Sequence, residues 1–153
     1  MSGESIDLTV RPLAAGDEAR WRELFTAYGV FYETVFTDEI LDRVWALLST
    51  PGAGVEGLVA EHDGVVVGFA HHRSHPDTFT GTRDRFLDDL YTDPAARGLG
   101  VGTMLIETIV GIARAAGETG VLRWITAADN VTAQRVYDRL ATKTTWLTYE
   151  VRL

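Results

Sequence analysis

The chain has 153 residues and no cysteine, and its 22 acidic side chains outnumber its 14 lysines and arginines, which gives a net charge of -8. A hydrophobic content of 46% excludes an intrinsically disordered chain, and the length fits one domain over residues 1–153 with a real core. The acidic balance argues against a nucleic-acid binder, and the lack of cysteine excludes disulfides, a thiolate nucleophile and cysteine-ligated metal sites.

The first half of the chain predicts a strand, two helices and a hairpin. Residues 6–11 alternate apolar and polar side chains, as a half-buried strand does. Apolar residues spaced three and four apart indicate helices over 17–32 and 38–50. Residues 55–61 and 65–73 are two strand-like runs joined by an Asp-Gly turn, so we expect a hairpin there.

The second half predicts strands that alternate with helices. Residues 86–92 form a strand that ends before Asp-Pro, and 102–116 carry the apolar face of a helix that ends at a glycine. We expect a strand over 121–126, a short helix over 131–140 and a closing strand over 144–153. The order β-α-α-β-β-β-α-β-α-β indicates an α/β fold in which helices cover one mixed sheet, with a parallel β-α-β crossover near the middle.

The connection between the strand at 86–92 and the next helix carries three alternating glycines, Gly98, Gly100 and Gly102, preceded by Arg97. Glycine lets the backbone turn without Cβ clashes and lets a ligand come close. The amide groups ahead of a helix N-terminus favour negative charge, and Arg97 can add a charge-assisted contact. The loop therefore predicts a phosphate site, more specifically one for a pyrophosphate, and a glycine-rich turn without a ligand is the alternative.

Two common nucleotide-binding loops do not fit this stretch. A Walker loop ends in Gly-Lys-Ser/Thr, whereas Gly102 is followed by Thr103 and Met104. The dinucleotide fingerprint needs a glycine at position 103 or 105, and these positions hold Thr103 and Leu105. The sequence thus argues against the usual nucleotide hydrolases and against a dinucleotide-binding loop.

Residues 97–102, Arg-Gly-Leu-Gly-Val-Gly, resemble the acyl-CoA pyrophosphate loop of the GNAT family of N-acetyltransferases. The strand and proline at 90–94 are similar to that family's approach to the loop, and Asn130, Ala133 and Tyr137 match its N-x-x-A-x-x-x-Y helix. Longer stretches, among them FLDDLYTDPAARGLGVG, resemble small bacterial enzymes and the yeast histone/polyamine acetyltransferases. One departure is Ala-Thr at 141–142, where many relatives have Gly-Phe, and it concerns the packing of the last strands.

The resemblance implies a mixed, mostly antiparallel central sheet with helices on both faces, and acetyl-CoA as the cofactor. In this family a backbone N–H of the strand ahead of the loop stabilises the oxyanion, and pantetheine fits where that strand splays from its neighbour. The residues implied to bind the cofactor are Leu90, Tyr91, Thr92, Arg97, Gly98, Leu99, Gly100, Val101, Gly102, Thr103, Asn130, Ala133 and Tyr137.

Two residues are expected to be catalytic. Tyr137 shares a helix face with Asn130 and Ala133, and we expect it to protonate the leaving sulfur or donate a hydrogen bond to it, with a core tyrosine as the alternative. Asn130 also has the position of a helix N-cap. An alkyl ammonium must lose a proton before it attacks, and the resemblance implies Asp88 as the base. A salt bridge or a solvated strand edge is the alternative reading of the Asp88–Asp89 pair.

The acceptor site is expected to contain Tyr28, Tyr32, His71, His75 and Asp89. An aromatic wall with acidic groups suits a cationic amine, although such a stripe also serves as plain core. Neutral imidazole suits a general base near pH 7, and His71 and His75 share one face if their strand continues, with a structural role as the alternative. These histidines and Asp77 offer no firm third ligand, so we expect no metal site.

The expected function is transfer of an acetyl group to a small amine such as a polyamine, an amino acid or an aminoglycoside, by direct attack in a ternary complex. The alternatives are acetylation of lysines or N-termini of proteins, a CoA-binding sensor without turnover, and a phosphate binder unrelated to CoA. No basic leader or long apolar run is present, so we expect a cytoplasmic protein with no membrane or nucleic-acid partner. The resemblance also implies a homodimer, with Trp146 and Tyr149 facing a partner or the core.

Overall fold

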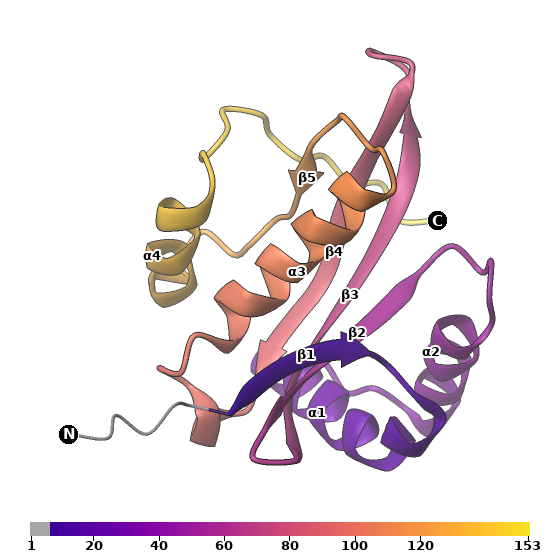
Figure 1. Ribbon diagram of the computed structural model, residues 1–153, viewed down its shortest axis with the longest axis vertical. Helices are drawn as coiled ribbons and strands as arrows, with labels where there is room; N and C mark the ends of the chain where they lie inside the picture. Colours follow the sequence, from indigo (N-terminus) through magenta and orange to yellow (C-terminus); the bar gives the residue numbers. More distant parts are fainter. Residues whose placement is uncertain (1–6) are drawn as a thin grey trace.

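One sheet of five strands forms the centre of the computed structural model, which describes residues 7–153 (Figure 1). The strands are β1 (Leu8–Pro12), β2 (Glu56–His62), β3 (Val65–Asp77), β4 (Thr82–Thr92) and β5 (Leu122–Arg123), and they lie in the order β1-β2-β3-β4-β5. The first four strands are antiparallel to one another, and β5 is parallel to β4. This mixed, mostly antiparallel sheet confirms the predicted fold class. Residue 6, where the first predicted strand begins, lies outside the described residues.

Helices cover both faces of the sheet. On one face, α1 (Glu18–Phe31) and α2 (Asp38–Ser49) enclose a core rich in aromatic side chains, and on the other face α3 (Val101–Ala115) packs on aliphatic residues (Figure 1). The shorter α4 (Val131–Leu140) joins the α3 side through Tyr137 and Leu140. The buried members of the aromatic core are Trp21, Leu24, Phe25, Leu41, Val59, Val66 and Phe69.

Two single-turn 3-10 helices, Ala15–Asp17 and Pro94–Ala96, lead into α1 and into the glycine loop. Asp93 caps the second one by accepting a hydrogen bond from the backbone N–H of Ala95 at 2.9 Å. Proline at the first helical position lacks the N–H that a helix start leaves unpaired. The Asp-Pro pair therefore ends β4 where the sequence predicts and starts the turn into the loop.

A β-bulge interrupts the pairing of β3 with β4. His71 pairs with Asp89 and His72 pairs with Leu87, so Asp88 is the extra residue in β4. A bulge shifts the alternation of side chains beyond it. Accordingly, Leu87 and Leu90 both contact the α3 side, although they are three residues apart.

The C-terminal part of the chain departs from the prediction. The expected strand over 121–126 shortens to β5, because β4 diverges from it after the pair of Phe86 with Arg123. The expected strand over 144–153 is wrong: these residues form no strand in the described chain. A strand needs a neighbour, and the two-residue β5 offers too short an edge. Trp146 and Tyr149 remain 80% and 88% exposed.

No helix within residues 7–153 combines the length and the hydrophobicity that crossing a membrane requires.

Candidate functional site

A cavity of about 530 Å³ lies where the end of β4, the glycine loop, α4 and the C-terminal end of α1 meet. Every residue expected to bind the cofactor lines it except Leu99, whose side chain packs on the α3-side core. Two of the expected acceptor residues, Tyr28 and Tyr32, form the α1 wall. The predicted residues in the lining are Tyr28, Tyr32, Leu90, Tyr91, Thr92, Arg97, Gly98, Gly100, Val101, Gly102, Thr103, Asn130, Ala133 and Tyr137.

The glycine loop has the backbone that its sequence predicts. Gly98 and Gly100 adopt φ values of 84° and 80°, in the left-handed region that favours glycine. Gly100 is the N-cap of α3, so the unpaired N–H groups of the first helical turn begin at Val101, and Val101, Gly102 and Thr103 line the cavity. Arg97 lines the same cavity. A helix N-terminus with an adjacent guanidinium is a site that attracts an anion.

The open edge of β4 supplies a second wall. β5 pairs with β4 only at Arg85 and Phe86, which confirms the expected splay between these strands. Beyond this point, residues 90–92 line the cavity. Strand backbone without a neighbour offers hydrogen-bonding groups to an extended ligand. The edge can therefore bind an extended amide-bearing chain and aim an N–H at a carbonyl oxygen.

The short helix α4 presents Asn130, Ala133 and Tyr137 to the cavity. Asn130 is the N-cap, as predicted: its Oδ1 accepts from the N–H of Ala133 at 3.3 Å. The ring of Tyr137 packs edge-on against Trp124, with centroids 5.4 Å apart. Burial raises the pKa of the Tyr137 phenol, so the hydroxyl keeps its proton and can donate a hydrogen bond.

Five residues that line the cavity are not among the site residues predicted from the sequence. Three of them, Thr132, Val136 and Arg139, recur at four- and three-residue intervals on α4 and form a row beside Ala133 and Tyr137, so the positions directly before these two residues were the available signal. Phe31 belongs to the aromatic end of the first helix with Tyr28 and Tyr32, so the sequence pattern does point to it as part of that wall. Nothing in the sequence pattern points to the last one, Ala96, as a lining residue.

The aromatic wall is the C-terminal end of α1. The ring of Tyr32 contacts the rings of Tyr28 and Phe31 edge-on, with centroids 5.0 Å away in each pair. Burial, and after it the nearby carboxylate of Asp89, raises the pKa of the Tyr28 phenol. Tyr28 therefore remains a neutral phenol in the lining of the cavity.

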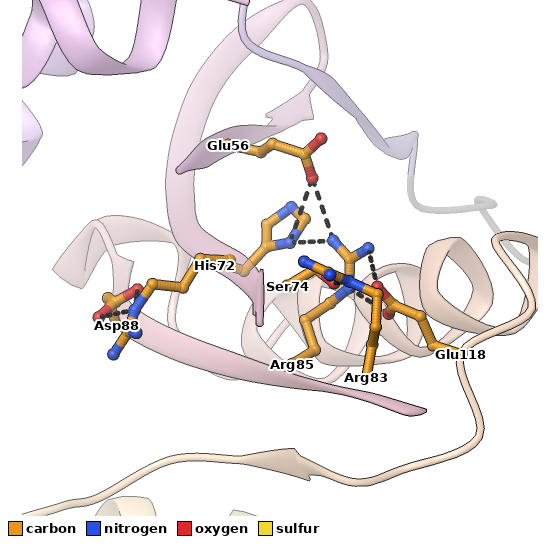
Figure 2. A network of polar contacts seen from close by, with 8 residues as sticks. Glu56, His72, Ser74, Arg83, Arg85, Asp88 and Glu118 are labelled. Carbon is orange, nitrogen blue, oxygen red and sulfur yellow. Dashed lines mark hydrogen bonds and ion pairs between the residues drawn. The ribbon is translucent and has the colours of Figure 1, made fainter. Parts of the chain in front are cut away.

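The remaining predicted residues lie outside the cavity lining. Asp88 accepts two hydrogen bonds from Nε of Arg73, at 3.2 and 3.1 Å (Figure 2). Burial raises the pKa of Asp88, against the opposing effect of Arg73. Nδ1 of His75 lies 3.2 Å from the carbonyl oxygen of Pro76. The structure thus leaves His75 apart from Asp89, which faces His71 across the two strands.

A second polar cluster lies on the α3 side of the sheet, and none of its members lines the cavity (Figure 2). Arg85 donates to both carboxylate oxygens of Glu118, at 2.8 and 2.9 Å, and to Glu56 at 3.0 Å. It also donates to Nδ1 of His72 at 3.0 Å. Because arginine only donates, the proton of neutral His72 is on Nε2, which is buried without a partner among the described residues. Burial lowers the pKa of His72 to about 4.

Comparison with known proteins places these features in one family. Residues 19–141 match the family described as "Acetyltransferase (GNAT) family". The chain is 30% identical over 145 residues to the D-amino-acid N-acetyltransferase HPA3 of Saccharomyces cerevisiae, covering 94% of this chain and 89% of the relative.

Solved structures agree in fold. The aminoglycoside N-acetyltransferase AAC(6')-Iy in complex with CoA superposes with a TM-score of 0.80 at 20% identity, covering 100% of this chain and 99% of that one. The ribosomal-protein-alanine N-acetyltransferase from Brucella melitensis biovar Abortus 2308 gives 0.78 at 22% identity, covering 95% and 99%. The resemblance inferred from the glycine loop and the α4 motif is confirmed, and the chain belongs to the GNAT family as an acetyl-CoA-dependent N-acetyltransferase.

Proposed function

We propose that this protein acetylates the primary amine of a small cationic acceptor by direct attack within a ternary complex. The cavity is the observation that carries the proposal. Its glycine loop, β4 edge and α4 face supply walls for an acyl-CoA, while its α1 wall is aromatic and separate from these three. Direct transfer requires both ligands to bind in one cavity, since the reacting atoms must meet.

The residues present fit acetyl-CoA. The positive φ angles of Gly98 and Gly100 and the start of α3 make an anion cradle for the pyrophosphate, with Arg97 beside it. Residues 90–92 would hold the pantetheine amides along the unpaired edge of β4. Leu99, whose side chain packs inward, would contribute through its backbone alone.

Acetyl-CoA supplies the acetyl group as a reactive thioester. A backbone N–H among residues 90–92 would stabilise the charge that develops on the carbonyl oxygen. Tyr137, held protonated by burial, would donate a hydrogen bond to the departing sulfur. Asp88 is the base that the family resemblance implies. It would have to leave Arg73 to take the amine's proton, and its raised pKa favours that role.

A thermal-shift series tests the cofactor, and thiol release tests the reaction. Acetyl-CoA and CoA at about 100 times Kd should each add about 2.7 kcal/mol of stability, and ATP and NAD should add none. D-amino acids enter the acceptor panel first because the yeast relative bears that name. The panel then adds 1,4-diaminobutane, an aminoglycoside and a lysine peptide. An equal shift with ATP, or turnover of the peptide alone, would contradict the proposal.

We propose further that residues 1–153 make a single cytoplasmic domain that assembles as a homodimer. Support for the dimer comes from residues 144–153, which form neither helix nor strand and in which Leu147, Tyr149 and Val151 alternate with other residues and are 79%, 88% and 87% exposed. Period-two alternation is the pattern of a strand with one buried face. Val121 and Ile125, next to β5, are 51% and 62% exposed. The C-terminal stretch of a second copy would cover this edge.

A further inference from the structure

Three side chains from three elements form a buried hydrogen-bonded row beside the cavity. The indole Nε1 of Trp21, on α1, donates to Nε2 of His71, on β3, at 2.9 Å. Nδ1 of His71 is 2.9 Å from Oδ2 of Asp89, on β4. Trp21 and His71 are 0% and 2% exposed, whereas the Asp89 side chain retains 24% exposure. The row therefore runs from the aromatic core outward and ends in a carboxylate.

The indole at one end fixes the imidazole tautomer. An indole N–H only donates, so Nε2 of His71 must carry the lone pair and Nδ1 the proton. His71 therefore donates to Asp89 as a neutral imidazole. Phe25 and Phe69 contact the imidazole, with ring centroids 5.1 and 4.7 Å away, and hold its plane. The two buried residues thus give the carboxylate one fixed hydrogen bond without neutralising its charge.

The neighbouring carboxylate, Asp88, is held by a charged partner instead of a neutral one. Asp88 is bound by the guanidinium of Arg73, a full positive charge. As the extra residue of the bulge, it also shifts Asp89 onto the face that carries His71 and α1. Of the two aspartates, Asp89 is the one that has no ion pair with an arginine among the described residues.

Asp89 lies at the boundary of the cavity. It precedes Leu90 and Tyr91, which line the cavity, and it is close enough to the lining residue Tyr28 to raise the pKa of that phenol. The charged and titratable groups around the row are Asp88 on β4, His72 and Arg73 on β3, and Tyr28 on α1. Arg73 carries a positive charge and is ion-paired with Asp88, whereas burial keeps His72 neutral.

We propose that Asp89 binds the ammonium group of the acceptor at the Tyr28 end of the cavity, and that His71 and Trp21 are positioning residues that aim its carboxylate. This rests on the proposed function, since it names the group that receives the amine. The carboxylate of Asp89 has lone pairs beyond those that face His71 and the nearby Tyr28 hydroxyl, and these accept from the ammonium, while the Tyr28 ring adds cation–π attraction. The arrangement selects acceptors that carry a positive charge.

Kinetics with 1,4-diaminobutane and D-lysine as probe amines test the binding role. Asp89→Asn keeps the shape and removes the charge, so the KM for amine should rise about 10-fold or more, as expected for a lost charge-assisted hydrogen bond. The KM for acetyl-CoA and the CoA thermal shift should stay within about two-fold of the wild-type values. An unchanged amine KM in Asp89→Asn would overturn the proposal while the CoA shift and thiol release stand.

Two further variants test the positioning role. Trp21→Phe keeps a ring but removes the N–H donor, and Trp45→Phe is its matched control, since that indole packs 5.3 Å from Trp21 outside the row. Trp21→Phe should raise the amine KM about 3- to 10-fold and let His71 sample both tautomers in nitrogen NMR, as loss of one neutral hydrogen bond predicts. The control should do neither. Equal effects of the two changes would reduce the row to core packing.

A variant of His71 and a binding assay complete the test. His71→Asn places an amide N–H near the position of Nδ1, so it should retain a lower amine KM than His71→Phe, with melting temperatures confirming that both fold. Direct titration removes any dependence on turnover: 1,4-diaminobutane should shift the Trp21 indole signal in the wild type and not in Asp89→Asn. No shift in the wild type would overturn the ammonium site, whereas a missing CoA thermal shift would overturn the proposed function itself.

Discussion

The phenol of Tyr137 is held in its protonated form by burial and faces the cavity from α4. A hydrogen bond to the departing sulfur acts mainly in the transition state, so its loss lowers kcat and leaves cofactor binding intact. Tyr137→Phe should reduce kcat about 10- to 100-fold, with the Kd for CoA within about two-fold of the wild type. Stopped-flow thiol release and calorimetry measure the two quantities. A variant that loses CoA affinity but keeps kcat would show a binding tyrosine instead.

Gly100 tests the anion cradle at a single backbone position. Its φ of 80° disfavours any side chain, and an alanine there costs about 1 kcal/mol or more. Gly100→Ala should therefore distort the loop and raise the Kd for CoA about 10-fold. Gly111→Ala is the matched control, because Gly111 lies inside α3, an added Cβ would meet nothing within 4 Å, and helical alanine is favourable. Equal CoA affinity in the two variants would contradict a cradle made by the loop backbone.

Residue patterns predict which residues of the glycine loop and α4 line the cavity better than they predict the contacts of His71. The glycine loop and the α4 motif are local in sequence, and local spacing fixes which side chains share a face. The pairing of Trp21 with His71 joins residues 50 positions apart, and the bulge at Asp88 shifts the strand register. Neither leaves a periodic signal. The sequence around His71 could thus point to it as a site residue. It could not predict that Trp21 donates a hydrogen bond to it or which ring nitrogen carries the proton.

At the scale of elements, the splay of β4 from β5 exposes the strand edge that lines the cavity. It also explains why the predicted strand over 144–153 does not form. The divergence after Phe86 opens the edge that residues 90–92 present to the cavity. It also leaves β5 with two paired residues, so the alternating stretch at 144–153 has no long edge to join within its own chain. Sequence alternation predicts strand propensity, but pairing depends on a neighbour elsewhere in space.

The C-terminal stretch carries the test of the dimer. Val151→Asp places a charge on the apolar face of 144–153, where Val151 is 87% exposed, so a buried interface should be lost. Val35→Asp is the matched control, since Val35 is 82% exposed in the loop between α1 and α2. Sedimentation should give a dimer for the wild type and the control and a monomer for Val151→Asp. A wild type that sediments as a monomer over the accessible concentration range would refute the assembly.

At the scale of the whole molecule, the cluster around Arg85 connects β2, β3 and β4 to the segment that follows α3. It links Glu56 on β2, His72 on β3 and Glu118, and these groups come from positions far apart in the chain (Figure 2). Such a buried network stabilises the fold only while its partners keep their charge states. The charge state of His72 therefore links the protonation of one buried ring to the stability of the whole chain.

The pKa of His72 falls from 6.5 to about 4 in the folded protein, because burial penalises the imidazolium. Between these values the unfolded chain binds a proton that the folded chain does not, so stability decreases as the pH falls through this window. The free energy of unfolding should drop by about 2 kcal/mol between pH 7 and pH 5 from this group. Urea titrations of the wild type and His72→Gln at both pH values measure it. The variant should be less stable than the wild type at pH 7 because it loses packing, yet its free energy of unfolding should fall by about 2 kcal/mol less between pH 7 and pH 5.

The carboxylates of Asp17 and Glu118, whose pKa values are lowered by Arg11 and Arg85, lose their contribution to stability only at more acidic pH. Parallel pH profiles for the two proteins would assign the loss to other groups and leave His72 with a packing role.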